Sequence, residues 1–183
     1  VFNTFNEAKA AFCRSVYIDN KSRWTGTTGM IQEHEGIVQD MLEQLYIGQK
    51  IQTPSMVVKR EVYEILGAFD RRLDCMEDWE MWTRIANNYP IAISNGVLAQ
   101  YRSHETNATN LTFHDGIALQ IHRLVFDIID GYIPSKIKNT YGKFRDKKQA
   151  EFLMLSYKSR KAKLKFKERL PFIKSILRLH PSF

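Results

Sequence analysis

The chain has 183 residues, 44% of them hydrophobic and 12% aromatic, with a formal net charge of +7. This composition excludes a disordered or collagen-like protein, and the length accommodates one domain with a hydrophobic core plus a smaller appendage. Two cysteines, Cys13 and Cys75, are too few for a disulfide framework or a zinc site, so we expect reduced thiols in a cytoplasmic protein.

Positive charge is concentrated in the last third of the sequence. Residues 132–183 contain 15 Lys and Arg against 3 Asp and Glu, a net charge of +12, whereas residues 1–131 carry a net charge of −5. We therefore divide the chain into a core, 1–131, and a basic helical extension, 132–183. The asymmetry predicts an anionic partner for the extension.

The first half of the chain predicts alternating strands and helices. β-Branched and aromatic residues predict a strand over 11–19, and an apolar stripe predicts a helix over 37–47. The Gly/Thr-rich loop between them lacks the glycine spacing and the lysine of a P-loop. A short strand over 56–58 and a short helix over 60–66 follow.

A third helix is predicted over 78–88, where apolar residues recur at helical spacing until Pro90. Two strands follow, over 91–94 and 97–102. The dipeptide between them is Asn-Gly, a strong hairpin signal, so we expect these strands to pair with each other. The core is then a mixed α/β fold.

Helices dominate the remaining sequence. The apolar pattern predicts a helix that opens at Thr112 or Asp115 and reaches Ile129. Proline and glycine then predict breaks, and basic residues mixed with apolar ones predict further helices. The breaks are at Pro134, Gly142 and Pro171, and the helices cover 143–167 and 172–179.

Acidic residues gather where the predicted helix over 78–88 begins. Glu77 and Asp78 would face unpaired backbone N–H groups and the positive end of the helix dipole. One interpretation of Asp78 is an ordinary helix cap. The two tryptophans that flank these acids differ, because Trp82 falls on the apolar face and is expected in the core, whereas Trp79 falls beside the carboxylates.

Four segments in this order resemble the second half of a family 2 glycosyltransferase. The resemblance covers roughly residues 12–110 and does not extend to the C-terminal third. The four segments are 54–60 (PSMVVKR), 67–70 (GAFD), 77–84 (EDWEMWTR) and 101–104 (YRSH).

The resemblance implies a role for each of five residues. Asp78 would be the base that removes a proton from the acceptor hydroxyl, and Glu77 would bind acceptor hydroxyls. Trp79 would be a platform for a sugar ring, Arg102 would reach a phosphate, and His104 would complete the shell of a divalent metal. From the residues alone, Arg102 in a salt bridge and His104 as an ordinary histidine remain open alternatives.

The resemblance also implies an inverting transferase that moves a sugar from a nucleotide-sugar to a glycan or lipid-linked acceptor, in cell-surface polysaccharide synthesis. Its fold would be part of the A-type glycosyltransferase sheet. Members use Mn²⁺ or Mg²⁺ held by an Asp-x-Asp pair, which this sequence lacks. We therefore expect the acceptor-side half of the catalytic domain, inactive without a donor-binding half.

A second interpretation is a non-catalytic α/β interaction module with a basic helical arm. Residues 143–179 would then bind an anionic membrane, at the inner face of the plasma membrane, or nucleic acid. No nucleic-acid motif accompanies the charge, which disfavours the latter. The same residues also suit ordinary packing helices. Because a half-domain exposes a sheet edge, self-association to a homo-oligomer is a further expectation.

Overall fold

The computed structural model describes residues 1–104, 107, 118–160 and 166–179, and in these residues the chain is a mixed α/β fold with a five-stranded sheet. The strands are β1 (Ala10–Ile18), β2 (Trp24–Thr27), β3 (Gly36–Ile37), β4 (Met56–Val58) and β5 (Ile91–Arg102). β1 lies at the centre and pairs in parallel with β5 along its whole length. β2 and β4 pair antiparallel with β1, and β3 pairs antiparallel with β5.

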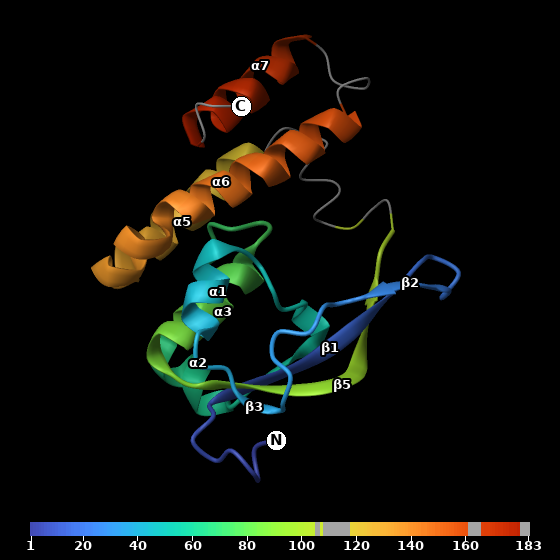
Figure 1. Cartoon of the computed structure of the whole chain (residues 1–183), viewed down its shortest axis with the longest axis vertical. Helices are drawn as coiled ribbons and strands as arrows, with labels where there is room; N and C mark the ends of the chain where they lie inside the picture. Colours follow the sequence, from blue (N-terminus) through green and yellow to red (C-terminus); the bar gives the residue numbers. More distant parts are fainter. Residues whose placement is uncertain (105–106, 108–117, 161–165, 180–183) are drawn as a thin grey trace.

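The helices form tiers on one side of this sheet (Figure 1). They are α1 (Met41–Ile47), α2 (Arg60–Leu66), α3 (Glu77–Asn88), α5 (Ala118–Tyr132), α6 (Ser135–Arg160) and α7 (Phe166–Leu179), with a short 3-10 turn, η1 (Thr53–Ser55). α1, α2 and α3 lie next to the sheet, α5 and α6 lie above them, and α7 packs on α6.

The main core lies between the sheet and the first tier of helices. Apolar side chains of β1 and β5 meet those of α1, α2, α3 and α5 there, and Trp82 is among them, as predicted. On the opposite side of the sheet, Phe2 and Phe5 of the N-terminal segment cover the small residues Ala11 and Ala92. Both faces of the sheet are therefore covered around β1.

The predicted hairpin at Asn95-Gly96 is wrong, because β5 continues through it as one strand. The pairing of β1 with β5 shifts register here, so the Asn-Gly dipeptide forms an irregularity in β5. The side chain of Glu35 holds it in place by accepting hydrogen bonds from the Ser94 hydroxyl at 2.6 Å and the Asn95 amide at 3.0 Å. A continuous parallel partner in β1 outweighs the local turn preference.

Two predicted helix breaks are also wrong. α6 passes through Gly142, which lies next to the Tyr46 hydroxyl of α1, and α7 passes through Pro171. Pro171 has no backbone N–H, so α7 loses one hydrogen bond, and burial of Phe172 and Ile176 offsets this loss. The predicted break at Pro134 is confirmed, because it separates α5 from α6.

Other boundaries differ less. Ile37 belongs to β3, so the helix predicted over 37–47 begins at Met41 instead. The predicted helix start at Thr112 or Asp115, and residues 161–165 of the predicted basic helix, lie outside the described residues. In the described ranges, no helix is long and apolar enough to cross a membrane.

A buried arginine fixes α6 to the rest of the fold. The Arg145 guanidinium donates to Asp130 of α5 at 2.6 Å and lies over the rings of Tyr46 and Phe126, 4.7 and 4.6 Å from their centroids. The Tyr46 hydroxyl donates to the same Asp130 carboxylate at 3.0 Å. The Arg145 side chain thus links α6 to α1 and α5 and holds the three helices together.

Candidate functional site

A cavity of about 840 Å³ lies where the start of α3, the end of β5 and the middle of α6 come together. All five residues singled out in the sequence line it: Glu77, Asp78, Trp79, Arg102 and His104. The opposite wall comes from residues 47–54 and from α5 and α6, through His122, Lys148, Gln149 and Phe152. The cavity thus gathers residues that are more than a hundred positions apart in the sequence.

The segment between α2 and α3 forms turns that place the first turn of α3 at this cavity. Gly67 ends α2 with a φ of +84°, a left-handed conformation that favours glycine. The Asp70 carboxylate then accepts hydrogen bonds from the Arg72 amide at 2.9 Å and from its guanidinium at 2.6 Å, which lower the pKa of Asp70 to about 2. Met76 precedes α3 with a φ of +66°, rare for a residue with a side chain.

Asp78 is not the cap of α3. Met76 occupies the cap position, and Asp78 lies in the first turn, where its carboxylate accepts hydrogen bonds from the Thr53 hydroxyl and the Trp79 amide, each at 2.7 Å. The carboxylate thus spans the gap between η1 and α3. The capping interpretation of the sequence is therefore wrong.

Both acids at the start of α3 hold protons more strongly than usual. Burial raises the pKa of Asp78, while hydrogen bonds from Thr53, Trp79 and Gln49 partly offset the increase. Burial also raises the pKa of Glu77, and the neighbouring Asp78 charge adds to the effect. A carboxylate with a raised pKa is a stronger base, and its position in a cavity makes it a candidate for proton transfer.

Trp79 does not fit its predicted role as a sugar platform. It is 3% exposed, its indole N–H donates to the Leu45 carbonyl at 2.7 Å, and its rings lie edge-on to His122 and Phe126. No face of the indole is open for stacking. The sequence could not distinguish it from an exposed tryptophan, because the elements that cover it lie at distant positions.

Arg102 and His104 lie at the end of β5, on another side of the cavity. The Arg102 guanidinium donates to the Asp19 carbonyl at 2.9 Å and to the Ser22 hydroxyl at 3.1 Å, so it braces the turn after β1. These contacts are to neutral oxygens, and Arg102 forms no salt bridge with the acidic residues that the structure describes. His104 is exposed at the cavity.

A metal site is not complete in the described part of the chain. No group of three His, Cys, Asp or Glu side chains is arranged there to hold a metal ion. His104 therefore stays a predicted single ligand, and the remaining ligands would have to come from a substrate diphosphate or from other residues.

We expect uridine diphosphate, with or without Mn²⁺, to leave the thermal unfolding midpoint of this chain unchanged. The reason is that the ligands present are too few to hold a metal–diphosphate pair. Differential scanning fluorimetry checks this. A Mn²⁺-dependent rise that His104→Ala abolishes and His34→Ala preserves would contradict it, and would assign the nucleotide site to this chain.

The sequence did not predict that α5 and α6 contribute residues to the cavity. His122 is 4% exposed and stacks on Phe152, with ring centroids 6.0 Å apart and planes at 11°. Gln149 donates to the Ile47 carbonyl at 2.8 Å and so ties α6 to the end of α1. No motif marks these residues, and only their places on two packed helices bring them to the cavity.

His122 should make stability depend on pH. Its pKa is lowered to about 4, mainly by burial, while a hydrogen bond with Gln149 partly offsets this decrease and the charge of Arg145 adds to it. As pH falls from 6.5 to 4, the unfolded chain binds a proton that folded His122 does not, so the free energy of unfolding should decrease by up to about 3 kcal/mol. Urea unfolding across this range measures the decrease.

The matched variants are His122→Phe, which keeps an aromatic ring in the cluster, and His34→Phe, which changes an exposed histidine. The first should flatten the pH dependence relative to wild type and the second should preserve it. Equal slopes for all three proteins would show that His122 is not the titrating group.

Comparisons with protein-family models and with curated protein sequences find no match for this chain. Its function must therefore be argued from the cavity and from the residues that line it.

Proposed function

We propose that this chain is the acceptor-side part of an inverting glycosyltransferase with an A-type fold, similar to family 2. The observation that carries the proposal is the convergence of Glu77, Asp78, Arg102 and His104 on one cavity. The resemblance in sequence implies roles in one reaction for the same four residues. Two of the four come from the start of α3 and two from the end of β5, about 25 positions later in the sequence.

In this proposal Asp78 is the base. It accepts the proton of an acceptor hydroxyl as that oxygen attacks the anomeric carbon of the donor sugar, whose bond to the nucleoside diphosphate breaks on the opposite face. Inversion of the anomeric carbon follows from a single displacement. The raised pKa of Asp78 and its place in the cavity support this assignment, and Thr53 holds one carboxylate oxygen in position.

Glu77 and Arg102 would serve the substrates rather than the proton transfer. Glu77 lies beside Asp78 at the cavity and suits hydrogen bonding to other hydroxyls of the acceptor. Arg102 already braces the turn after β1, and a phosphate would have to share or displace its bonds to Asp19 and Ser22. A Mn²⁺ or Mg²⁺ ion, bound with His104 and a diphosphate, would neutralise charge on the leaving group.

The donor would be held mainly by other residues. The sequence contains no Asp-x-Asp pair, so we assign most donor contacts to residues other than those of the cavity. The test is a transfer assay of the complete protein with a panel of nucleotide-sugars and saccharide or lipid-linked acceptors. An inverted anomeric configuration in the product would support the proposal, and retention of configuration would exclude it.

The second candidate is a non-catalytic interaction module. It is favoured by apolar and basic side chains exposed together on α6 and α7. In a module of this kind the acids at the start of α3 would only stabilise the helix, so substituting them would leave binding to its partner unchanged.

A further inference from the structure

The outer side of α7 presents a stripe of apolar side chains. Leu170, Ile173 and Leu177 are exposed and recur at helical spacing, with exposed Lys174 and Arg178 beside them. The opposite side of the helix packs on α6 through two buried residues, Phe172 and Ile176. α7 is therefore anchored on one side and apolar and cationic on the other. We call these five exposed residues the α7 stripe.

α6 has a similar exposed side. Phe144 and Leu155, the latter 67% exposed, lie three turns apart on the side of the helix that faces solvent. Lys143, Lys147 and Lys158 are exposed around them. We call these five residues the α6 outer face. The other side of α6 is buried, against α1 and α5 through Arg145 and against α7 through Leu153 and its neighbours.

We propose that the α7 stripe and the α6 outer face dock on an anionic lipid surface. Exposed leucines and phenylalanines would enter the boundary between headgroups and acyl chains, while the lysines around them would meet lipid phosphates. The five cations of these two surfaces complement a negatively charged leaflet. Nucleic acid would satisfy the lysines but would leave the apolar side chains in water, which favours lipid as the partner.

The α6 outer face lies next to the cavity. Lys148 lies over the ring of Phe144, 5.7 Å from its centroid, and lines the cavity together with Phe152. A bilayer that contacts Phe144 would therefore lie at the α6 edge of the cavity. This orientation rests on the proposed function: it suits an acceptor whose saccharide enters the cavity while its lipid anchor stays in the bilayer. The docking itself does not depend on catalysis.

Co-sedimentation with lipid vesicles tests the proposal. The full chain should bind vesicles of equal parts phosphatidylglycerol and phosphatidylcholine, and bind pure phosphatidylcholine at least about ten-fold more weakly. Lys143→Gln/Lys147→Gln should lower the partition coefficient by roughly ten-fold or more, since each lysine near the surface contributes about a five-fold factor. The matched control, Arg60→Gln/Arg71→Gln, removes two exposed cations elsewhere and should bind like wild type.

A second set of variants tests the apolar contribution. Leu170→Ser/Ile173→Ser/Leu177→Ser should weaken vesicle binding by at least about ten-fold, because less apolar area would leave water. Ile65→Ser/Leu98→Ser removes exposed apolar groups outside α6 and α7 and should have no effect. Circular dichroism and thermal unfolding verify that each variant is folded, as expected for exposed side chains.

Three results would overturn the proposal. One is equal binding to neutral and anionic vesicles, or none to either. Another is tighter binding to a single-stranded oligonucleotide than to anionic vesicles. The last is a dimer in light scattering that the triple serine variant dissociates, since a second copy would then cover the stripe. Asp78→Asn should bind vesicles like wild type, so loss of transfer and loss of docking are separate outcomes.

Discussion

Asp78→Asn is expected to lower the rate of sugar transfer by the complete protein by about 10²–10⁴-fold, the usual contribution of a positioned general base. Asparagine has nearly the same shape and can still accept the hydrogen bond from Thr53, but it cannot take up a proton. A steady-state assay of kcat and KM measures the loss, which should fall mainly on kcat. Asp74→Asn is the control, because Asp74 is exposed and does not line the cavity.

The pH dependence of the rate gives a second signature of Asp78. Because burial raises its pKa, the wild-type rate should fall as pH drops through a value above that of an ordinary aspartate, and the residual rate of Asp78→Asn should lack this limb. The substitution that lowers the rate should not lower the stability of the fold. Ionised Asp78 is disfavoured in the folded state, so Asp78→Asn should be at least as stable as wild type at neutral pH. A full transfer rate in this variant would exclude the catalytic assignment.

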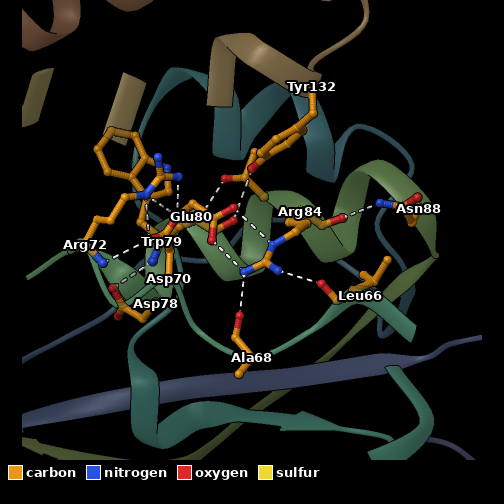
Figure 2. Close-up of polar contacts among 11 residues, drawn as sticks. Leu66, Ala68, Asp70, Arg72, Asp78, Trp79, Glu80, Arg84, Asn88 and Tyr132 are labelled. Atoms are coloured by element: carbon orange, nitrogen blue, oxygen red, sulfur yellow. Dashed lines mark hydrogen bonds and ion pairs between the residues drawn. The ribbon is translucent and has the colours of Figure 1, made fainter. Parts of the chain in front are cut away.

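Glu80→Ala is expected to lower the free energy of unfolding by about 3–5 kcal/mol, the range for breaking a buried ion pair from one side. Glu80 is 2% exposed and accepts two hydrogen bonds from Arg84, at 3.1 and 2.8 Å. Arg84 also donates to the carbonyls of Leu66 and Ala68, at 2.7 and 3.0 Å (Figure 2). Without Glu80 this cation would stay largely buried and would lose its ion-pair partner.

Urea unfolding of three variants separates the buried pair from surface charge. Glu61→Ala removes an exposed partner of Lys9 and should cost much less stability than Glu80→Ala, because solvent screens an exposed ion pair. Glu80→Met/Arg84→Met replaces the buried pair by apolar groups and should be more stable than Glu80→Ala alone. If Glu80→Ala cost no more than Glu61→Ala, Arg84 would not be the link between α3 and the segment after α2.

The sequence predicts the α/β class and four elements of the fold, which are β1, β4, α2 and α3. The predictions of these elements succeed because apolar spacing and short motifs are local signals. The residues that the resemblance singles out in α3 and at the end of β5 line the cavity, and their chemical roles stay predictions. The prediction that Asp78 caps the helix is wrong because Met76 adopts a left-handed conformation and occupies the cap position, two residues earlier. No local sequence pattern predicts that conformation of Met76.

The remaining features depend on contacts between distant segments. β5 continues through a strong turn dipeptide because it pairs with β1 on both sides of it and Glu35 binds the irregularity there. α7 continues through Pro171 because residues that follow this proline are buried against α6. His122 joins the cavity because α5 packs on α3, where its ring meets Trp79, and because Phe152 of α6 stacks on it. Trp79 is covered by the same packing. Sequence patterns give the preferences of each element, while these placements require the tertiary structure.

The most direct measurement of the central claim, that this cavity binds the sugar acceptor, is chemical-shift mapping of the chain with a panel of soluble oligosaccharides. We expect perturbed amides around Thr53, at the start of α3 and at the end of β5, with weaker binding in Glu77→Gln and unchanged binding in the surface control Asp74→Asn. Perturbations that fall elsewhere on the chain, or that are the same in Glu77→Gln as in wild type, would contradict it.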